Sequence, residues 1–238
     1  MKNRILIKTL AVAMTAAFLA GCSKTPAGES VTDIENTTAT ESSVTETESS
    51  AVVTEIQAEK DITDVAVAYG MTKVTDWQEM NNLWGGGFDS ASVYYVSKDS
   101  NEAMSMYSSL FNQDAKSVPD VRADELVMCL DKVTSESDGR STTTQIYKIT
   151  LADAASAQGL YDSFSQMKDS YKSSTGTASG YTYTIGFFES ANGCVAVGTF
   201  MKDNVVIRML SIGDVEAADK CLSFFCGELG FESPLTLK

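Results

Sequence analysis

The sequence predicts an α+β domain built on a mainly antiparallel sheet with helices packed on it, preceded by a disordered tether. Segments with apolar residues at every second position alternate with segments whose apolar residues recur every three or four positions. The last three predicted strands are joined by turns of two or three residues, which only antiparallel neighbours allow. An apolar share of 43% in 238 residues is enough for a core of one or two small domains.

The first half of the domain, which we take as residues 61–238, alternates helices and strands. A helix is expected over Val74–Trp84, with Thr75 and Gln78 in capping-box spacing. A strand at 92–96 and a helix at 100–111 follow. Two strands, 125–133 and 142–150, flank turn-forming residues and predict a hairpin.

The second half begins with the longest expected helix, Asp153–Tyr171, and ends with a helix over Asp214–Leu229. Between them three strands form a meander, in which Asn192 and Gly193 are typical of a type I′ turn. Residues 205–212 are largely apolar on both alternating faces, as expected of a central strand. The strands of the meander are Tyr181–Glu189, Cys194–Met201 and Val205–Ser211.

An Asp–Ala pattern recurs at three strand-to-helix junctions. Asp is followed by Ala four residues later, and by large apolar or aromatic residues at eight and eleven. We expect the Asp to cap the helix and the Ala to let it approach the sheet. Two explanations of the pattern remain open. The three units could descend from a duplication, or they could be independent strand-to-helix units that obey the same packing rules. The three pairs are Asp99/Ala103, Asp153/Ala157 and Asp214/Ala218.

Composition excludes several classes of function. There is no histidine, so neither a Ser-His-Asp nor a Cys-His mechanism is available. A net charge of −14 argues against a nucleic-acid partner. No metal-binding or phosphate-binding motif is present, because the run Gly85–Gly87 has no following Lys and Asp131–Glu136 fails the calcium-loop pattern. We therefore expect no cofactor, no metal and no catalytic residue.

The first 22 residues carry a targeting signal. Lys2, Arg4 and Lys8 precede a short apolar run, too short to span a bilayer, that ends in Leu19-Ala20-Gly21-Cys22. This arrangement resembles the bacterial lipoprotein signal peptide. The resemblance implies cleavage between Gly21 and Cys22, a diacylglyceryl group on the Cys22 thiol, and anchoring to the cell membrane. Residues 1–21 would then be the signal peptide.

Residues 22–60 read as the lipidated cysteine followed by a disordered tether. Of the 38 residues from 23 to 60, 14 are Ser or Thr, eight are acidic and none is aromatic. Such a segment would hold an extracytoplasmic domain away from the membrane. A Gram-positive surface suits a long tether of this kind better than a Gram-negative envelope.

Four cysteines remain in the domain: Cys129, Cys194, Cys221 and Cys226. Cys221 and Cys226 lie five apart on one predicted helix and cannot bridge each other. Small buried apolar side chains are one interpretation of the four. A Cys129–Cys194 disulfide, or one to the last helix, is the other.

Five aromatic residues within nineteen positions form the candidate binding patch. In an exported protein, exposed aromatic rings beside the triglycine could stack on a sugar or a peptide, although such residues more often belong to the core at a helix–strand junction. The five are Trp77, Trp84, Phe88, Tyr94 and Tyr95.

The functional hypothesis is a non-enzymatic module that binds a small ligand, a cell-wall polymer or an envelope protein. A structural or assembly component of the envelope is the alternative. A histidine-free wall hydrolase with paired carboxylates is a third reading.

Overall fold

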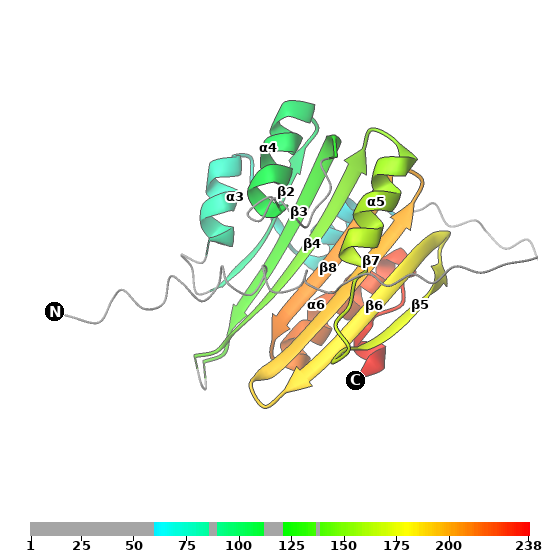
Figure 1. Ribbon diagram of the computed structural model, residues 1–238. Helices are drawn as coiled ribbons and strands as arrows, with labels where there is room; N and C mark the ends of the chain where they lie inside the picture. The colour runs from blue at the N-terminus through cyan, green and yellow to red at the C-terminus, as the bar shows by residue number, and fades with distance from the viewer. Residues whose placement is uncertain (1–59, 86–89, 112–120, 137–138) are drawn as a thin grey trace, which may run out of the picture. The chain divides into compact units, whose positions relative to one another are not determined.

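A computed structural model describes residues 60–85, 90–111, 121–136 and 139–238. These residues form one eight-stranded sheet in the order β1-β2-β3-β4-β8-β7-β6-β5 (Figure 1). Only β1 and β2 are parallel, and every other neighbouring pair is antiparallel. The predicted fold class is confirmed. The strands are β1 Thr72–Lys73, β2 Ala91–Ser97, β3 Ala123–Thr134, β4 Ser141–Leu151, β5 Lys172–Ala178, β6 Tyr181–Ser190, β7 Gly193–Lys202 and β8 Val205–Gly213.

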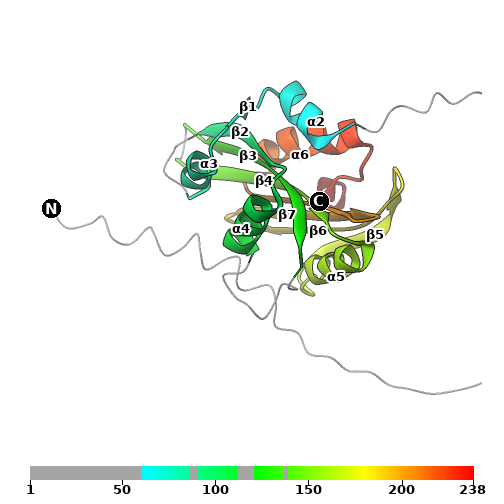
Figure 2. The ribbon, with the colours of Figure 1, turned by 90° about the horizontal axis from the view of Figure 1, so that it is seen from above.

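Helices cover both faces of the sheet, giving three layers (Figure 2). One core layer lies under α2, α6 and the short 3-10 helix η2, and the other lies under α3, α4 and α5. We call the first the α6 face and the second the α5 face. The helices are α2 Ile62–Tyr69, α3 Trp77–Trp84, α4 Ser100–Phe111, α5 Ala154–Phe164, α6 Val215–Leu229 and η2 Pro234–Leu237.

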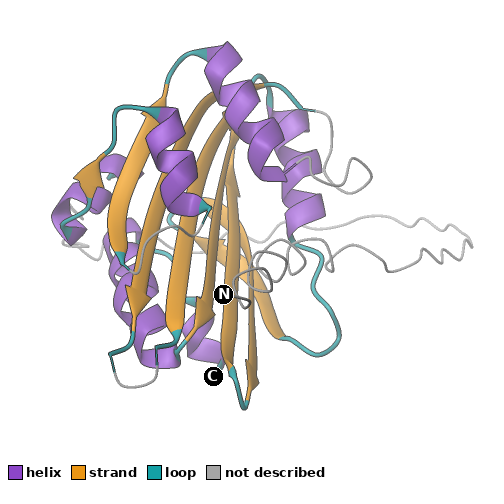
Figure 3. Cartoon of the chain, turned by 90° about the vertical axis from the view of Figure 1, so that its left-hand side faces the viewer, coloured by secondary structure: helices purple, strands orange, loops and turns teal. Residues whose placement is uncertain are grey.

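The alternation of each strand explains the two layers, because successive side chains enter opposite cores. In β4, Ile146 contributes to the α6 face, whereas Tyr147 and Ile149 contribute to the α5 face. β8 lies between β4 and β7, so the prediction of a central strand is confirmed. Figure 3 shows the sheet between its helical layers.

The three Asp–Ala junctions behave as predicted. Asp99 accepts hydrogen bonds from the backbone of Asn101 and Glu102, and Asp153 and Asp214 cap α5 and α6 in the same way. The three alanines that follow are fully buried: Ala103, Ala157 and Ala218. Of the three helices, α4 and α5 lie on one face of the sheet and α6 on the other.

Several boundaries differ from the predictions. The helix expected to reach Tyr171 ends at Phe164, and α6 is the longest described helix. The 172–178 strand, β5, was not anticipated because its residues are small and polar, with no apolar alternation to mark them. The expected helix from Val74 begins only at Trp77.

Two local details are corrections as well. Asp76, and not Thr75, caps α3, since its side chain accepts from the backbone N–H of Gln78. The β6–β7 turn has Ala191 and Asn192 at its centre, since Ser190 pairs with Gly193. Only Gly193, at φ 128°, has a positive φ there, so the turn is not of type I′.

Candidate functional site

A groove of about 340 Å³ opens on the α6 face at one end of the sheet. The beginning of α2, the end of α6, the β7–β8 turn and the beginnings of β6 and β8 line it together. Its size lies at the small end of the range for ligand pockets. The lining combines six polar or charged residues, Lys60, Asp61, Lys148, Lys202, Asp203 and Asn204, with six apolar or aromatic ones, Ile62, Tyr181, Val205, Ile207, Leu229 and Phe231.

The aromatic wall of the groove is set by the end of α6. Gly230, at φ 67°, ends the helix in the left-handed conformation, and the N–H of Phe231 donates to the carbonyl of Cys226 at 2.7 Å. This turn places the Phe231 ring 4.9 Å from Tyr181 and stacks it 4.2 Å from Phe200. The wall is therefore built from the closing turn of the last long helix.

The charged wall centres on Lys148, which projects from the interior strand β4. Its Nζ lies 2.7 Å from Asp61 Oδ2 and 3.5 Å from Glu125 Oε1, and its side chain is 18% exposed. Burial would lower the pKa of Lys148, but the two carboxylates outweigh it and raise this pKa above its usual value. The ammonium group is thus held charged in this wall of the groove.

Asp61 serves two neighbours at once. Its Oδ1 accepts from the backbone N–H of Thr63 at 2.9 Å and so caps α2, while its Oδ2 pairs with Lys148. Burial acts to raise the pKa of Asp61, but the hydrogen bonds from Lys148 and Thr63 outweigh it and leave the pKa below its usual value. The residue ties the start of α2 to the sheet beside the groove.

The rim carries two further lysines. Lys60 pairs with Glu228 of α6, and Lys202 Nζ lies 5.4 Å from the centroid of the Tyr181 ring. In the β7–β8 turn, Asn204 donates to the carbonyl of Leu151 at 2.7 Å, which fixes the turn against the end of β4. The groove therefore combines an aromatic wall and a charged rim with four aliphatic residues that we call its apolar floor, Ile62, Val205, Ile207 and Leu229.

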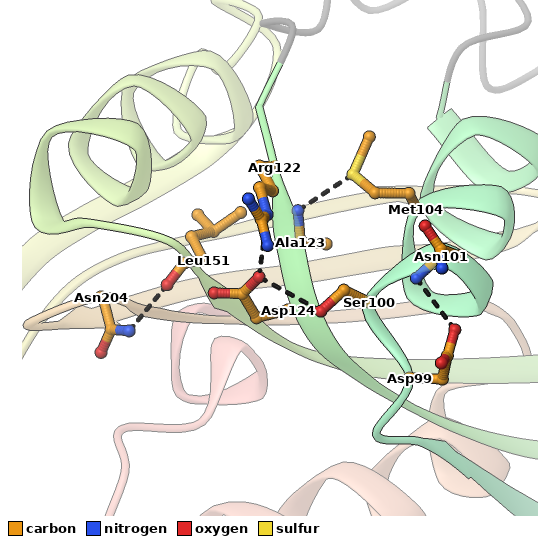
Figure 4. Close-up of polar contacts among 9 residues, drawn as sticks. All are labelled: Asp99, Ser100, Asn101, Met104, Arg122, Ala123, Asp124, Leu151 and Asn204. Carbon is orange, nitrogen blue, oxygen red and sulfur yellow. Dashed lines mark hydrogen bonds and ion pairs between the residues drawn. The ribbon is translucent and has the colours of Figure 1, made fainter.

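A second hollow, of about 580 Å³, lies at the start of α4. Two of its polar side chains engage the neighbouring Asp124: Ser100 Oγ donates to Asp124 at 3.4 Å, and Arg122 Nε lies 3.2 Å from the same oxygen (Figure 4). Asp99 occupies the first backbone N–H groups of the helix. We prefer the groove on the α6 face, because the lining of this hollow contains two apolar residues and no aromatic ring, whereas six apolar or aromatic residues line the groove.

The predicted aromatic patch is not brought together as one surface. Tyr94 is 8% exposed and belongs to the core of the α6 face, whereas Tyr95 is 5% exposed and belongs to that of the α5 face. Tyr94 and Tyr95 point to opposite sides because they are consecutive residues of β2. The inclusion of Tyr94 with the other rings was therefore wrong.

Trp77 and Trp84 pack against the core of the α5 face, and Phe88 lies outside the described residues. Trp77 lies 6.1 Å from Tyr95 between ring centroids, and Tyr95 donates to Glu102 at 2.7 Å. The Trp84 Nε1 atom is buried without a hydrogen-bond partner. The groove lies on the other face of the sheet from both tryptophans.

All four domain cysteines are buried and free, which favours the interpretation as apolar core residues. Burial raises the pKa of Cys226 to about 12 and raises the pKa of the other three thiols as well. Cys22 and Gly21, with the rest of 1–59, lie outside the described residues. No group of three or more metal-ligating side chains occurs in the part of the chain that the structure describes.

The groove could not have been found from sequence spacing, since its lining comes from residues up to 171 positions apart. One local signal was present: Lys148 stands at an inward-facing position of a strand between Ile146 and Thr150.

Among the described helices, none is long and apolar enough to cross a membrane. Comparisons of the chain with protein-family models, curated proteins and solved structures find no match.

Proposed function

We propose that this chain is a lipid-anchored extracytoplasmic protein whose domain binds a small solute in the α6-face groove without transforming it. The observation that carries the proposal is the groove itself, in which an aromatic wall and a charged rim converge on one apolar floor. At about 340 Å³, it suits a ligand of roughly amino-acid or monosaccharide size.

The arrangement of charge supports binding in preference to chemistry. Lys148, the most enclosed charged group of the groove, is held by Asp61 and Glu125, so it offers neither a lone pair nor an unpaired charge to a substrate. The rim lysines and Asp203 can orient a ligand that carries both an acidic and a hydrogen-bonding group. The apolar floor contributes by removing the ligand's carbon skeleton from water.

The anchor would place this site near a membrane. Lys60, the last residue of the segment expected to be the tether, lines the groove, so the groove lies beside the first residues of the domain. A cell membrane facing a wall, as on a Gram-positive surface, is the location that we propose. Envelope assembly without a small ligand is the competing role.

A thermal-shift screen of the full-length chain in detergent tests the proposal, using amino acids, monosaccharides, their acidic derivatives and wall fragments. A ligand at one hundred times its dissociation constant stabilises the folded state by about 2.7 kcal/mol. Val205→Trp should fill the groove and abolish the shift, whereas Val133→Trp, at an exposed valine remote from the groove, should retain it.

A second matched pair tests the rim. Lys202→Glu should weaken the binding of an acidic ligand. Lys172→Glu, on the edge strand β5, should leave that binding unchanged. A flat screen on a cooperatively unfolding protein would contradict solute binding. A ligand whose shift survives Val205→Trp would contradict the groove as its site.

A further inference from the structure

The two edges of the sheet are built differently. β1, at one edge, has only two residues. β5, at the other, has seven, and all seven pair with β6 in an uninterrupted antiparallel register. Among the described residues no strand pairs with the outer side of β5, which lies at the margin of the sheet in Figure 1.

β5 has few of the devices that usually protect a sheet edge. Proteins blunt exposed edges by shortness, charged side chains (especially Lys), proline, bulges or a covering helix or loop. β5 contains no proline and no register shift, and its one charged residue is Lys172 at its first position. Ser173, Thr175 and Thr177 are exposed on one face of the strand. A row of backbone donors and acceptors is therefore open to another strand.

We propose that β5 pairs antiparallel with β5 of a second copy of this chain, joining two sheets into one. The strand is self-complementary about Thr175. In that register Thr175 lies opposite Thr175, Ser173 opposite Thr177, and Lys172 opposite Ala178. Hydroxyl-bearing residues form favourable cross-strand pairs, and no like charges face each other.

The symmetry of this pairing fits proteins held on one membrane. Two antiparallel edge strands in one continuous sheet are related by a two-fold axis perpendicular to the sheet, so the faces do not exchange. Lys60 and the groove lie on the α6 face of each copy, and both chains would therefore approach from the same side. The two-residue edge strand β1 offers no comparable template, which limits the assembly to two copies.

Two seven-residue strands bury a small interface, below the area of a typical stable dimer. Anchoring raises the effective concentration of the copies, and this favours association without further contacts. We therefore expect pairing to be strong on membranes and weak in dilute solution. Only this gain rests on the proposed lipid anchor; the pairing itself requires neither the anchor nor the groove.

Oxidative cross-linking on membranes of cells producing the full chain tests the pairing. Thr175→Cys places two thiols opposite each other across the two-fold axis, at a separation compatible with a disulfide. Thr182→Cys is the matched control, because Thr182 is equally exposed on the same face but one strand inward. The four domain cysteines are buried and should not compete.

A dimer band for Thr175→Cys, absent from Thr182→Cys and from the unmodified chain, is the expected result. Equal bands for the two variants, or none for either, would overturn the proposal. Sedimentation of the detergent-solubilised chain at high concentration is an independent measurement. Thr175→Lys would place two ammonium groups opposite each other across the two-fold axis, and their repulsion should leave this variant monomeric. Thr182→Lys should sediment as the unmodified dimer, and a monomeric unmodified chain at every concentration would also overturn it.

Discussion

Lys148 is the charged residue whose position says most about how this domain is held together. It stands in an interior strand, yet its ammonium group reaches two carboxylates, one of which caps the first described helix. Removing one member of a partly buried ion pair leaves the other charge without compensation. Because the Asp61 side chain is 43% exposed, water screens part of that cost.

We expect Lys148→Met to lower the free energy of unfolding by about 1–2 kcal/mol at neutral pH. The pKa of Asp61 is lower in the folded state than in the unfolded chain, so its contribution is complete above the unfolded value and lost as the pH falls through the folded one. The difference between the variant and the unmodified protein should therefore shrink below about pH 4. Urea unfolding at pH 7, 5 and 3 measures it.

Lys220→Met is the control for this experiment, because Lys220 lies exposed on α6. It should change stability by no more than about 0.5 kcal/mol at any of these pH values. The raised pKa of Lys148 sets the limit on the alkaline side: while the two carboxylates are charged, its contribution is present below the unfolded pKa and disappears as the pH rises through the folded value. A penalty for Lys148→Met that stays constant down to pH 3 would contradict the pairing with Asp61.

At the scale of elements, one device recurs at the start of every described α-helix. An Asp accepts hydrogen bonds from the first backbone N–H groups of each, and its negative charge lies at the positive end of the helix dipole. The sequence revealed this at three of the five, because a strand ending in Asp followed by a buried Ala is a local signal. The remaining two caps, Asp61 and Asp76, were missed for lack of that context.

Asp214→Ala tests the device on the longest described helix. The Asp214 side chain accepts from the backbone of both Glu216 and Ala217, so its loss leaves two donors without that partner. We expect a destabilisation of about 0.5–2 kcal/mol in chemical unfolding. Asp214→Asn keeps the acceptor and should recover most of it. Equal losses in the two variants would show that the carboxylate charge, and not the hydrogen bonds, stabilises this end of α6.

Strands could be predicted from the sequence where burial of one face produces alternating apolar and polar residues. Strands without that alternation could not be predicted. β6, β7 and β8 were located to within two residues, because each contributes large side chains to one or both cores. β5 was missed since Ser, Thr and Gly form an edge strand through backbone pairing alone. The same polarity made the preceding helix look longer than α5 is.

The groove shows a comparable limit at the scale of the whole molecule. The aromatic residues close together in the sequence, Trp77 and Tyr94 among them, were separated by the sheet, whereas Lys60 and Phe231 were brought to one site by it. Spacing along a chain predicts contacts within a helix or a hairpin. The order of eight strands decides which distant residues meet, and that order was not available from the pattern.

The charge of the whole chain bears on how it reaches a membrane. Of the net charge of −14, +3 falls in residues 1–22, −6 in 23–60 and −11 in 61–238, so the domain itself would be repelled by anionic headgroups. If the chain is lipid-anchored as we propose, attachment would come from the lipid expected on Cys22, and two acyl chains suffice for stable anchoring where one does not. With such an anchor, the domain would need no basic surface to hold it at the membrane.

We expect Cys22→Ser to prevent lipidation and cleavage, so that the chain either accumulates as a precursor 21 residues longer or appears in the soluble fraction. Ser23→Ala, at the adjacent position, should leave both processing and membrane association unchanged. Fractionation of producing cells, with mass measurement of the chain, distinguishes these outcomes. A Cys22→Ser chain of mature length that stays in the membrane fraction would contradict the lipid anchor, and would require the acidic domain to bind the membrane through contacts that its charge disfavours.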